Sequence, residues 1–191
     1  LGPWLADRRL VLPDGTRTIH HVDSHDSHEW GRLGQYRREA FGEGASRAFF
    51  ALCCFLEGGV MVFTGAEDGS EAFYRRLLRL KAEQPALSRG SESFDGVTAD
   101  DSHAFCSVRI GPGQVLVPVI NFSPDARRVT VSMTDHALFG APSAAYDHVA
   151  ERTVAIEAKP GHAWTLTLDL DPFQAALIEL HAAPSAPAQR P

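Results

Sequence analysis

Apolar residues follow two different periods along the chain, and the period changes about halfway. Residues 45–56 are almost entirely apolar, which is typical of a helix that is buried over most of its surface. Within residues 71–84, Phe73, Leu77 and Leu80 fall on one stripe of a helix. We therefore predict two helices in the first half, one from each of these segments.

Two short strands are predicted to alternate with these helices. Val60–Phe63 is a continuous apolar run, as in a parallel strand covered on both faces, and another strand is expected to begin near residue 18. Asp68, with Glu71 three residues later, resembles a capping box at the start of the second helix. Residues 18–84 thus have the order of an α/β unit with parallel strands. Two such repeats cannot close a sheet, so further strands must come from elsewhere.

The second half contains short apolar runs separated by turn residues. In Ala163–Leu170, apolar residues from Trp164 onward alternate with polar ones, so one face is buried and the other is solvated. Five further runs have a similar length: 104–110, 115–122, 127–133, 152–157 and 173–180. Six such strands predict an antiparallel sandwich or barrel with Trp164 in its core. The tail, residues 183–191, is rich in Pro, Ala and polar residues and is predicted to be disordered.

Composition narrows the class of protein. The chain has 191 residues, of which 44% are hydrophobic, and a net charge of −6. This balance argues against nucleic acid or an anionic membrane as a partner, and no apolar run reaches the ~18 residues of a membrane span. The cysteines Cys53, Cys54 and Cys106 have no regular spacing, so we expect buried thiols rather than a disulfide framework. This usage favours a reducing compartment, and we expect a cytoplasmic protein.

The segment His20–Trp30 holds four histidines, two aspartates and a glutamate. One interpretation is a metal site, because His21, Asp23 and His25 would share one face if the segment were a strand. No second cluster with metal-ligand spacing accompanies it, so we predict no metal. A small histidine-rich metal-binding protein nevertheless stays an alternative.

Two other interpretations concern catalysis. Ser24, His25 and Asp26 are consecutive, whereas the members of a hydrolase triad come together in space, and no G-x-S-x-G motif is present. The remaining interpretation uses position: the segment follows a predicted strand, and α/β barrels build their active sites at the carboxyl ends of strands. Exposed loop histidines without a function are the plain alternative.

Several phrases together resemble the C-terminal part of the α-amylase family of glycoside hydrolases. They are VDSHDSHEW (residues 22–30), GGVMVFTGAEDG (58–69) and YRRLLRLKAEQPALSRG (74–90), followed by the β-rich half. The resemblance implies an α+β fold in two parts. Residues 1–90 would be a partial (β/α)8 TIM barrel, its last two βα units, and residues 91–182 an antiparallel β-sandwich domain.

The resemblance also implies roles for individual residues. Asp26 matches the aspartate that holds sugar hydroxyls and stabilises the transition state, and His25 matches the histidine that hydrogen-bonds the sugar being cleaved. Glu67 matches a glutamate after the eighth barrel strand and is expected to be either a structural residue or part of the cleft wall. As aromatic residues near this segment, Trp30 and Tyr36 are expected either to stack on sugar rings or to pack in the fold, and Trp30 is our candidate for substrate binding. Ser24 stands where many members have Asn, which leaves the specificity open.

The nucleophile and general acid of such an enzyme come from upstream strands, and no matching motif occurs in this chain. We therefore expect the C-terminal portion of an α-glucan-active retaining glycoside hydrolase or transglycosidase. Its partners would be an α-glucan or oligosaccharide and the upstream barrel portion of the same protein, with no cofactor, and the chain alone would be inactive. The alternative from another class is a non-catalytic carbohydrate-binding or structural β-module.

Overall fold

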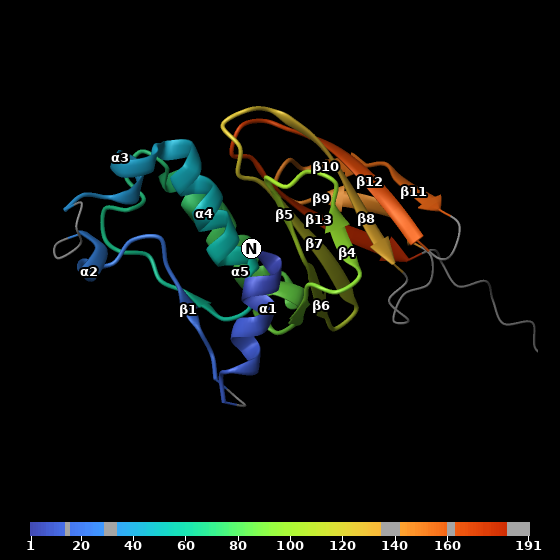
Figure 1. Cartoon of the computed structure of the whole chain (residues 1–191), viewed down its shortest axis with the longest axis horizontal. Helices are drawn as coiled ribbons and strands as arrows, with labels where there is room; N and C mark the ends of the chain where they lie inside the picture. Colours follow the sequence, from blue (N-terminus) through green and yellow to red (C-terminus); the bar gives the residue numbers. More distant parts are fainter. Residues whose placement is uncertain (14–15, 29–33, 135–141, 160–162, 183–191) are drawn as a thin grey trace, which may run out of the picture.

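The computed structural model describes residues 1–191 except 14–15, 29–33, 135–141, 160–162 and 183–191. The helices are α1 (Gly2–Leu10), α2 (His25–His28), α3 (Arg37–Phe41), α4 (Glu43–Phe55), α5 (Glu71–Glu83) and α6 (Pro85–Ser88). The strands are β1 (Ile19–His20), β2 (Gly59–Val60), β3 (Ser91–Ser93), β4 (Val97–Ala99), β5 (Ala104–Cys106), β6 (Val108–Gly111), β7 (Gln114–Asn121), β8 (Arg127–Thr134), β9 (Pro142–Asp147), β10 (Arg152–Val154), β11 (Ile156–Lys159), β12 (Ala163–Leu170) and β13 (Ala175–Ala182). Helices occupy one half of the molecule and the antiparallel strands the other (Figure 1).

β1 and β2 form a short parallel pair, in which Ile19 lies opposite Gly59 and His20 opposite Val60. The predicted direction is confirmed, but the strands are shorter than expected, and β2 ends at Val60. Among the described residues each strand pairs only with the other, so the two form a sheet of two strands. These residues contain no closed barrel.

The two predicted helices are confirmed as α4 and α5, which lie side by side (Figure 1). Phe50 of α4 stacks on Tyr74 of α5 with ring centroids 3.7 Å apart. The predicted capping box is absent, because Ser70 rather than Asp68 is the N-cap of α5. The Ser70 hydroxyl instead bonds two charged side chains, those of Glu43 and Arg47.

The β-rich half consists of two antiparallel sheets, as predicted. One has the order β10-β9-β13-β7-β6-β3, with β5 also paired to β7, and the other has the order β11-β12-β8-β4. Three of their strands were not predicted, β3, β4 and β9. β3 and β4 have only three residues each, and β9 carries Ala144 and Ala145 where a strand usually carries larger apolar side chains.

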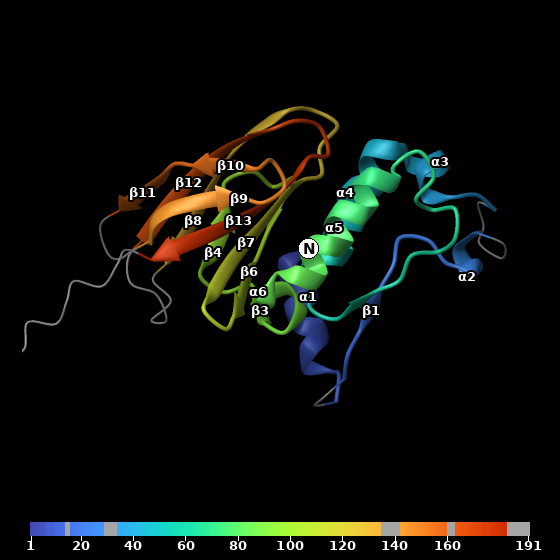
Figure 2. The same cartoon turned by 180° about the vertical axis from the view of Figure 1, so that it is seen from behind.

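Strand β7 contributes to two hydrophobic cores. Val117 and Val119 belong to the core between the sheets, whereas Leu116 and Ile120 belong to the core that the helices cover. This follows from the alternation of side chains along a strand. The helices therefore pack on the outer face of the larger sheet, as Figure 2 shows from behind.

Trp164 lies in the inter-sheet core, which confirms its predicted burial. The last helix ends at Ser88 and the first antiparallel strand begins at Ser91, close to the expected change of structure. The predicted division at residue 90 into two domains stays a prediction, and the tail 183–191 lies outside the described residues. No described helix has the length and apolar character needed to cross a bilayer.

Candidate active site

The chain that leaves β1 turns into α2, and two serines hold this turn. The Ser24 N–H donates to Ser27 Oγ at 2.8 Å, and the Ser27 N–H donates to Ser24 Oγ at 3.3 Å. Such reciprocal bonds satisfy backbone donors that the first turn of a helix leaves open. The backbone that carries His25 and Asp26 is thus held by bonds that use neither of these side chains.

His25 and Asp26 project from this turn into solvent. Their side chains are 70% and 81% exposed, and His25 Nε2 lies 3.2 Å from Asp26 Oδ1. An ion pair this exposed contributes little to stability. The structure therefore brings together the two residues that the sequence singled out and leaves both accessible to a ligand.

Asp23, only 2% exposed, is buried just before this turn. Its Oδ1 accepts a 2.9 Å hydrogen bond from the backbone N–H of Arg37, the first residue of α3. The shared strand face expected for His21, Asp23 and His25 does not form, because β1 ends at His20. Within the described ranges, no three His, Cys, Asp or Glu side chains are grouped closely enough to hold a metal ion.

The loop after β2 lies beside this region through contacts with α3. The Tyr36 hydroxyl donates to the Thr64 carbonyl at 3.0 Å, and the Tyr36 ring centroid is 6.2 Å from that of Phe63. Of its two expected roles, Tyr36 therefore has contacts typical of packing. Glu67 is half-buried in the same loop, and Trp30 lies outside the described residues.

Tyr74 of α5 is a titratable group whose pKa is shifted and which interacts with the Asp23 and Glu67 carboxylates of these loops. The pKa of its hydroxyl is raised to about 12, mainly by burial, and the nearby Asp23 and Glu67 carboxylates contribute to this increase. Tyr74 therefore keeps its proton at neutral pH and cannot serve as a phenolate nucleophile.

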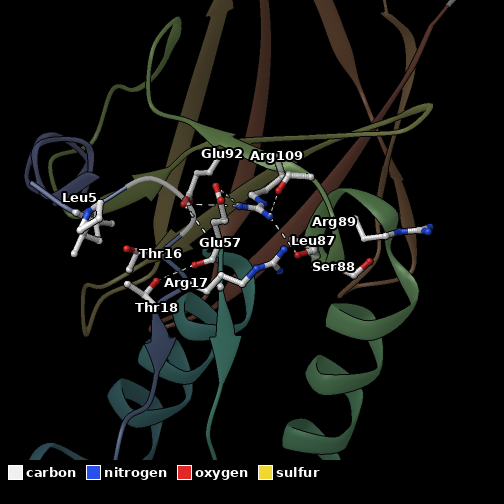
Figure 3. A pocket seen from close by; sticks show the side chains of 14 residues that line it. Leu5, Thr16, Arg17, Thr18, Glu57, Leu87, Ser88, Arg89, Glu92 and Arg109 are labelled. Atoms are coloured by element: carbon white, nitrogen blue, oxygen red, sulfur yellow. Dashed lines mark hydrogen bonds and ion pairs between the residues drawn. The ribbon is translucent and has the colours of Figure 1, made fainter. Parts of the chain in front are cut away.

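A separate pocket of about 500 Å³ lies at the opposite, amino ends of β1 and β2 (Figure 3). Its lining includes Thr18, which precedes β1, and Glu57, which precedes β2. Arg109 forms its inner wall and is directed toward Glu92 and Glu57, each with a carboxylate oxygen 3.9 Å from Arg109 Nη1. The pocket therefore lies away from the turn that carries Asp26.

The bonds of Arg109 indicate a structural role. Its side chain is 1% exposed, and it donates to the carbonyls of Ala86, Leu87 and Gly90 at 3.0–3.2 Å. The Arg109 guanidinium thus connects β6 to α6 and the residues just after it by hydrogen bonds. Sequence reasoning missed Arg109, and the only signal was a charged residue between Val108 and Ile110 in an apolar strand.

Lys81 of α5 adjoins this cluster. Burial lowers the pKa of its ammonium group to about 8, and the nearby Arg109 cation contributes to the decrease. Lys81 Nζ donates to the Leu56 carbonyl at 2.6 Å, beyond the end of α4. The amino end of the β1–β2 pair therefore contains two buried charged residues, Arg109 and Glu92, beside the half-buried Lys81.

Comparison with known proteins supports this architecture. No protein-family model and no curated protein sequence matches the chain. Among solved structures, a maltogenic α-amylase from Thermotoga neapolitana superposes with a TM-score of 0.72 at 11% identity, covering 95% of this chain and 45% of that enzyme. The α-amylase from Geobacillus thermoleovorans, in complex with acarbose, gives 0.72 at 14% identity and covers 95% of this chain and 43% of its own. A three-domain cyclomaltodextrin glucanotransferase gives 0.68 at 14% identity, with 94% and 39% covered.

These matches show that the chain has a fold found in glycoside hydrolases. More narrowly, it resembles α-amylase-family enzymes, and the resemblance seen in the sequence is confirmed at the level of the fold. The chain spans less than half the length of each of these enzymes, which is consistent with a C-terminal part.

Proposed function

We propose that this chain is the C-terminal portion of an α-glucan-active retaining glycoside hydrolase or transglycosidase. β1 and β2, with the helices that follow them, would be the last two βα units of a (β/α)8 barrel. The antiparallel sheets would be the C-terminal domain of the same enzyme. Upstream strands of the barrel would supply the carboxylate nucleophile and the general acid, so the chain alone would not catalyse.

The observation that carries this proposal is the placement of Asp26. β1 and β2 run parallel, and Asp26 lies in the first turn after the carboxyl end of β1. This is the end of a parallel sheet at which α/β enzymes build their sites. Asp26 is exposed although the turn around it is held by backbone bonds. A fixed backbone with an accessible carboxylate is what contact with a ligand requires.

The chemistry available at this turn suits a glycosyl transfer. Cleavage of a glycosidic bond passes through an oxocarbenium-like transition state, and hydrogen bonds to the sugar hydroxyls strengthen as it forms. The Asp26 carboxylate would stabilise the positive charge and accept hydrogen bonds from hydroxyls. His25, at 3.2 Å from Asp26, would bind the same sugar, and Trp30 would contact a neighbouring ring. No cofactor is needed for these roles.

The test uses the complete natural protein that contains this chain, assayed on maltooligosaccharides. Asp26→Asn keeps the size of the side chain and removes its charge. We expect kcat to fall about 100-fold or more, with an unchanged circular dichroism spectrum. Asp169→Asn is the matched control, because Asp169 is similarly exposed on β12. Near-normal turnover of Asp26→Asn would remove Asp26 from its proposed role.

A non-catalytic carbohydrate-binding module is the alternative from another class. Such a module presents aromatic rings on an exposed sheet face, and Trp164, the candidate from the sequence, is buried. Binding measurements separate the two proposals. A binding module would hold maltooligosaccharides equally well after Asp26→Asn, whereas the catalytic site would not.

A further inference from the structure

The loops after β1 and β2 are joined by the segment that begins α3. On one side, the Arg37 N–H donates to buried Asp23 at 2.9 Å. On the other side, the Tyr36 hydroxyl donates to the Thr64 carbonyl at 3.0 Å. The Arg38 guanidinium donates to the carbonyl of Gly65, which follows Thr64. We call Asp23, Tyr36, Arg38, Thr64 and Gly65 the α3 clasp.

Arg38 makes three kinds of contact within and beside the clasp. Its Cζ lies 4.4 Å from the centroid of the Tyr36 ring, which is a cation–π geometry. The same guanidinium bonds the Gly65 carbonyl, and its Nη2 lies 3.8 Å from Asp68 Oδ2. The Arg38 side chain is 21% exposed. A planar guanidinium can stack and donate at the same time, which a lysine cannot reproduce.

Gly65 shows how closely the loop after β2 approaches Tyr36. Its φ is +87°, a backbone conformation that residues other than glycine rarely adopt. A Cβ at this position would lie 2.5 Å from the Tyr36 hydroxyl oxygen. The loop therefore touches Tyr36 through bare backbone. The separation between this loop and α3 is set by direct contact of their atoms.

We propose that Tyr36 and Arg38 are positioning residues that hold the loop after β2 against the turn that carries His25 and Asp26. This inference rests on the proposed function of Asp26. Tyr36 and Arg38 fix the start of α3, and α3 in turn fixes Asp23, three residues before Asp26. A displacement of about 1 Å at a catalytic group costs about 100-fold in rate. The clasp should therefore affect kcat more than KM.

The experiment compares variants of the complete natural protein by amide hydrogen exchange and by kinetics on maltooligosaccharides. Arg38→Ala removes all three contacts, and Tyr36→Phe removes only the bond to Thr64. The reporting amides are those of Arg37, bonded to Asp23, and of Ser27, bonded to Ser24 Oγ. Arg128→Ala is the control, because it removes an exposed ion pair on β8.

We expect Arg38→Ala to speed exchange of both reporting amides by about tenfold or more and to lower kcat about tenfold, with KM changed less than about twofold. Tyr36→Phe should give a smaller change of the same kind, and Arg128→Ala should give none. Unchanged exchange at both amides in both variants would overturn the proposal. Faster exchange spread evenly over the chain would also overturn it, because that pattern indicates general destabilisation.

The exchange measurement keeps this inference separate from the proposed function. If the unmodified protein has no activity on α-glucans, the proposed function fails. The exchange rates of the Arg37 and Ser27 amides then still decide whether the clasp holds the turn. If Arg38→Ala does not fold, Tyr36→Phe provides the same two readouts.

Discussion

The two ends of the β1–β2 pair use charged side chains in opposite ways. At the amino end, Arg109 is buried and bonded to backbone carbonyls, with Glu92 close by. At the carboxyl end, His25 and Asp26 are exposed, and backbone bonds hold the turn without them. A buried charge that loses its partner is costly, whereas an exposed ion pair contributes little. We infer that the amino end is needed for the fold and that the carboxyl end is available for chemistry.

The largest effect is expected at Arg109. Arg109→Ala removes the guanidinium that lies 3.9 Å from the buried Glu92 carboxylate. It also removes the hydrogen bonds that this guanidinium donates to the carbonyls of Ala86, Leu87 and Gly90. We expect the free energy of unfolding to fall by about 3–5 kcal/mol, measured by urea denaturation. Arg128→Ala, at an exposed ion pair, should change it by less than about 0.5 kcal/mol. Equal losses in the two variants would contradict the contrast between buried and exposed charge.

A smaller effect concerns Lys81 and depends on pH. Its pKa is about 8 in the folded protein, against 10.5 for an ordinary lysine. Below pH 8 the ammonium is charged in both states, and the folded state bears the cost of burying it. As the pH rises from 8 to 10.5, the folded state gives up this proton before the unfolded state does, so stability increases.

Comparison with Lys81→Met isolates this contribution, because other titrating groups are common to both proteins. Among them are Cys53 and Cys54, whose pKa values burial raises. The unfolding free energy of the natural protein minus that of Lys81→Met should increase between pH 7 and pH 10. The expected increase is on the order of 2 kcal/mol. A difference that stays constant with pH would show that Lys81 is solvated at the amino end.

How far the sequence predicts this molecule depends on how local each interaction is. The apolar run of α4 and the alternation of β12 were sufficient to predict those elements, because burial of one face follows directly from local periodicity. Arg109 was missed because its carbonyl partners lie about 20 residues earlier in the chain. Asp26 was singled out only through a family resemblance, and its role stays a prediction.

The contacts of the α3 clasp predict an effect at Gly65. Gly65→Ala places a Cβ 2.5 Å from the Tyr36 hydroxyl, whereas Gly69, with a φ of +79°, has no atom within 4 Å of such a Cβ. Both substitutions strain the backbone, so their difference measures the steric term alone. We expect Gly65→Ala to be less stable than Gly69→Ala by about 1 kcal/mol, in urea denaturation. Removing the hydroxyl with Tyr36→Phe should reduce this difference, and a difference unaffected by Tyr36→Phe would place the loop farther from Tyr36.

The smallest effect on stability is expected at the exposed pair itself. Asp26→Asn removes one partner of an ion pair whose side chains are 70% and 81% exposed. The unfolding free energy should therefore change by less than about 0.5 kcal/mol, whereas the proposed function predicts a large loss of turnover. Ser27→Ala is the complementary variant, since it removes the hydroxyl that the Ser24 N–H uses and should cost about 1 kcal/mol. A large loss of stability in Asp26→Asn would mean that the carboxylate holds the turn, and Asp26 would then belong with the structural charges of the amino end.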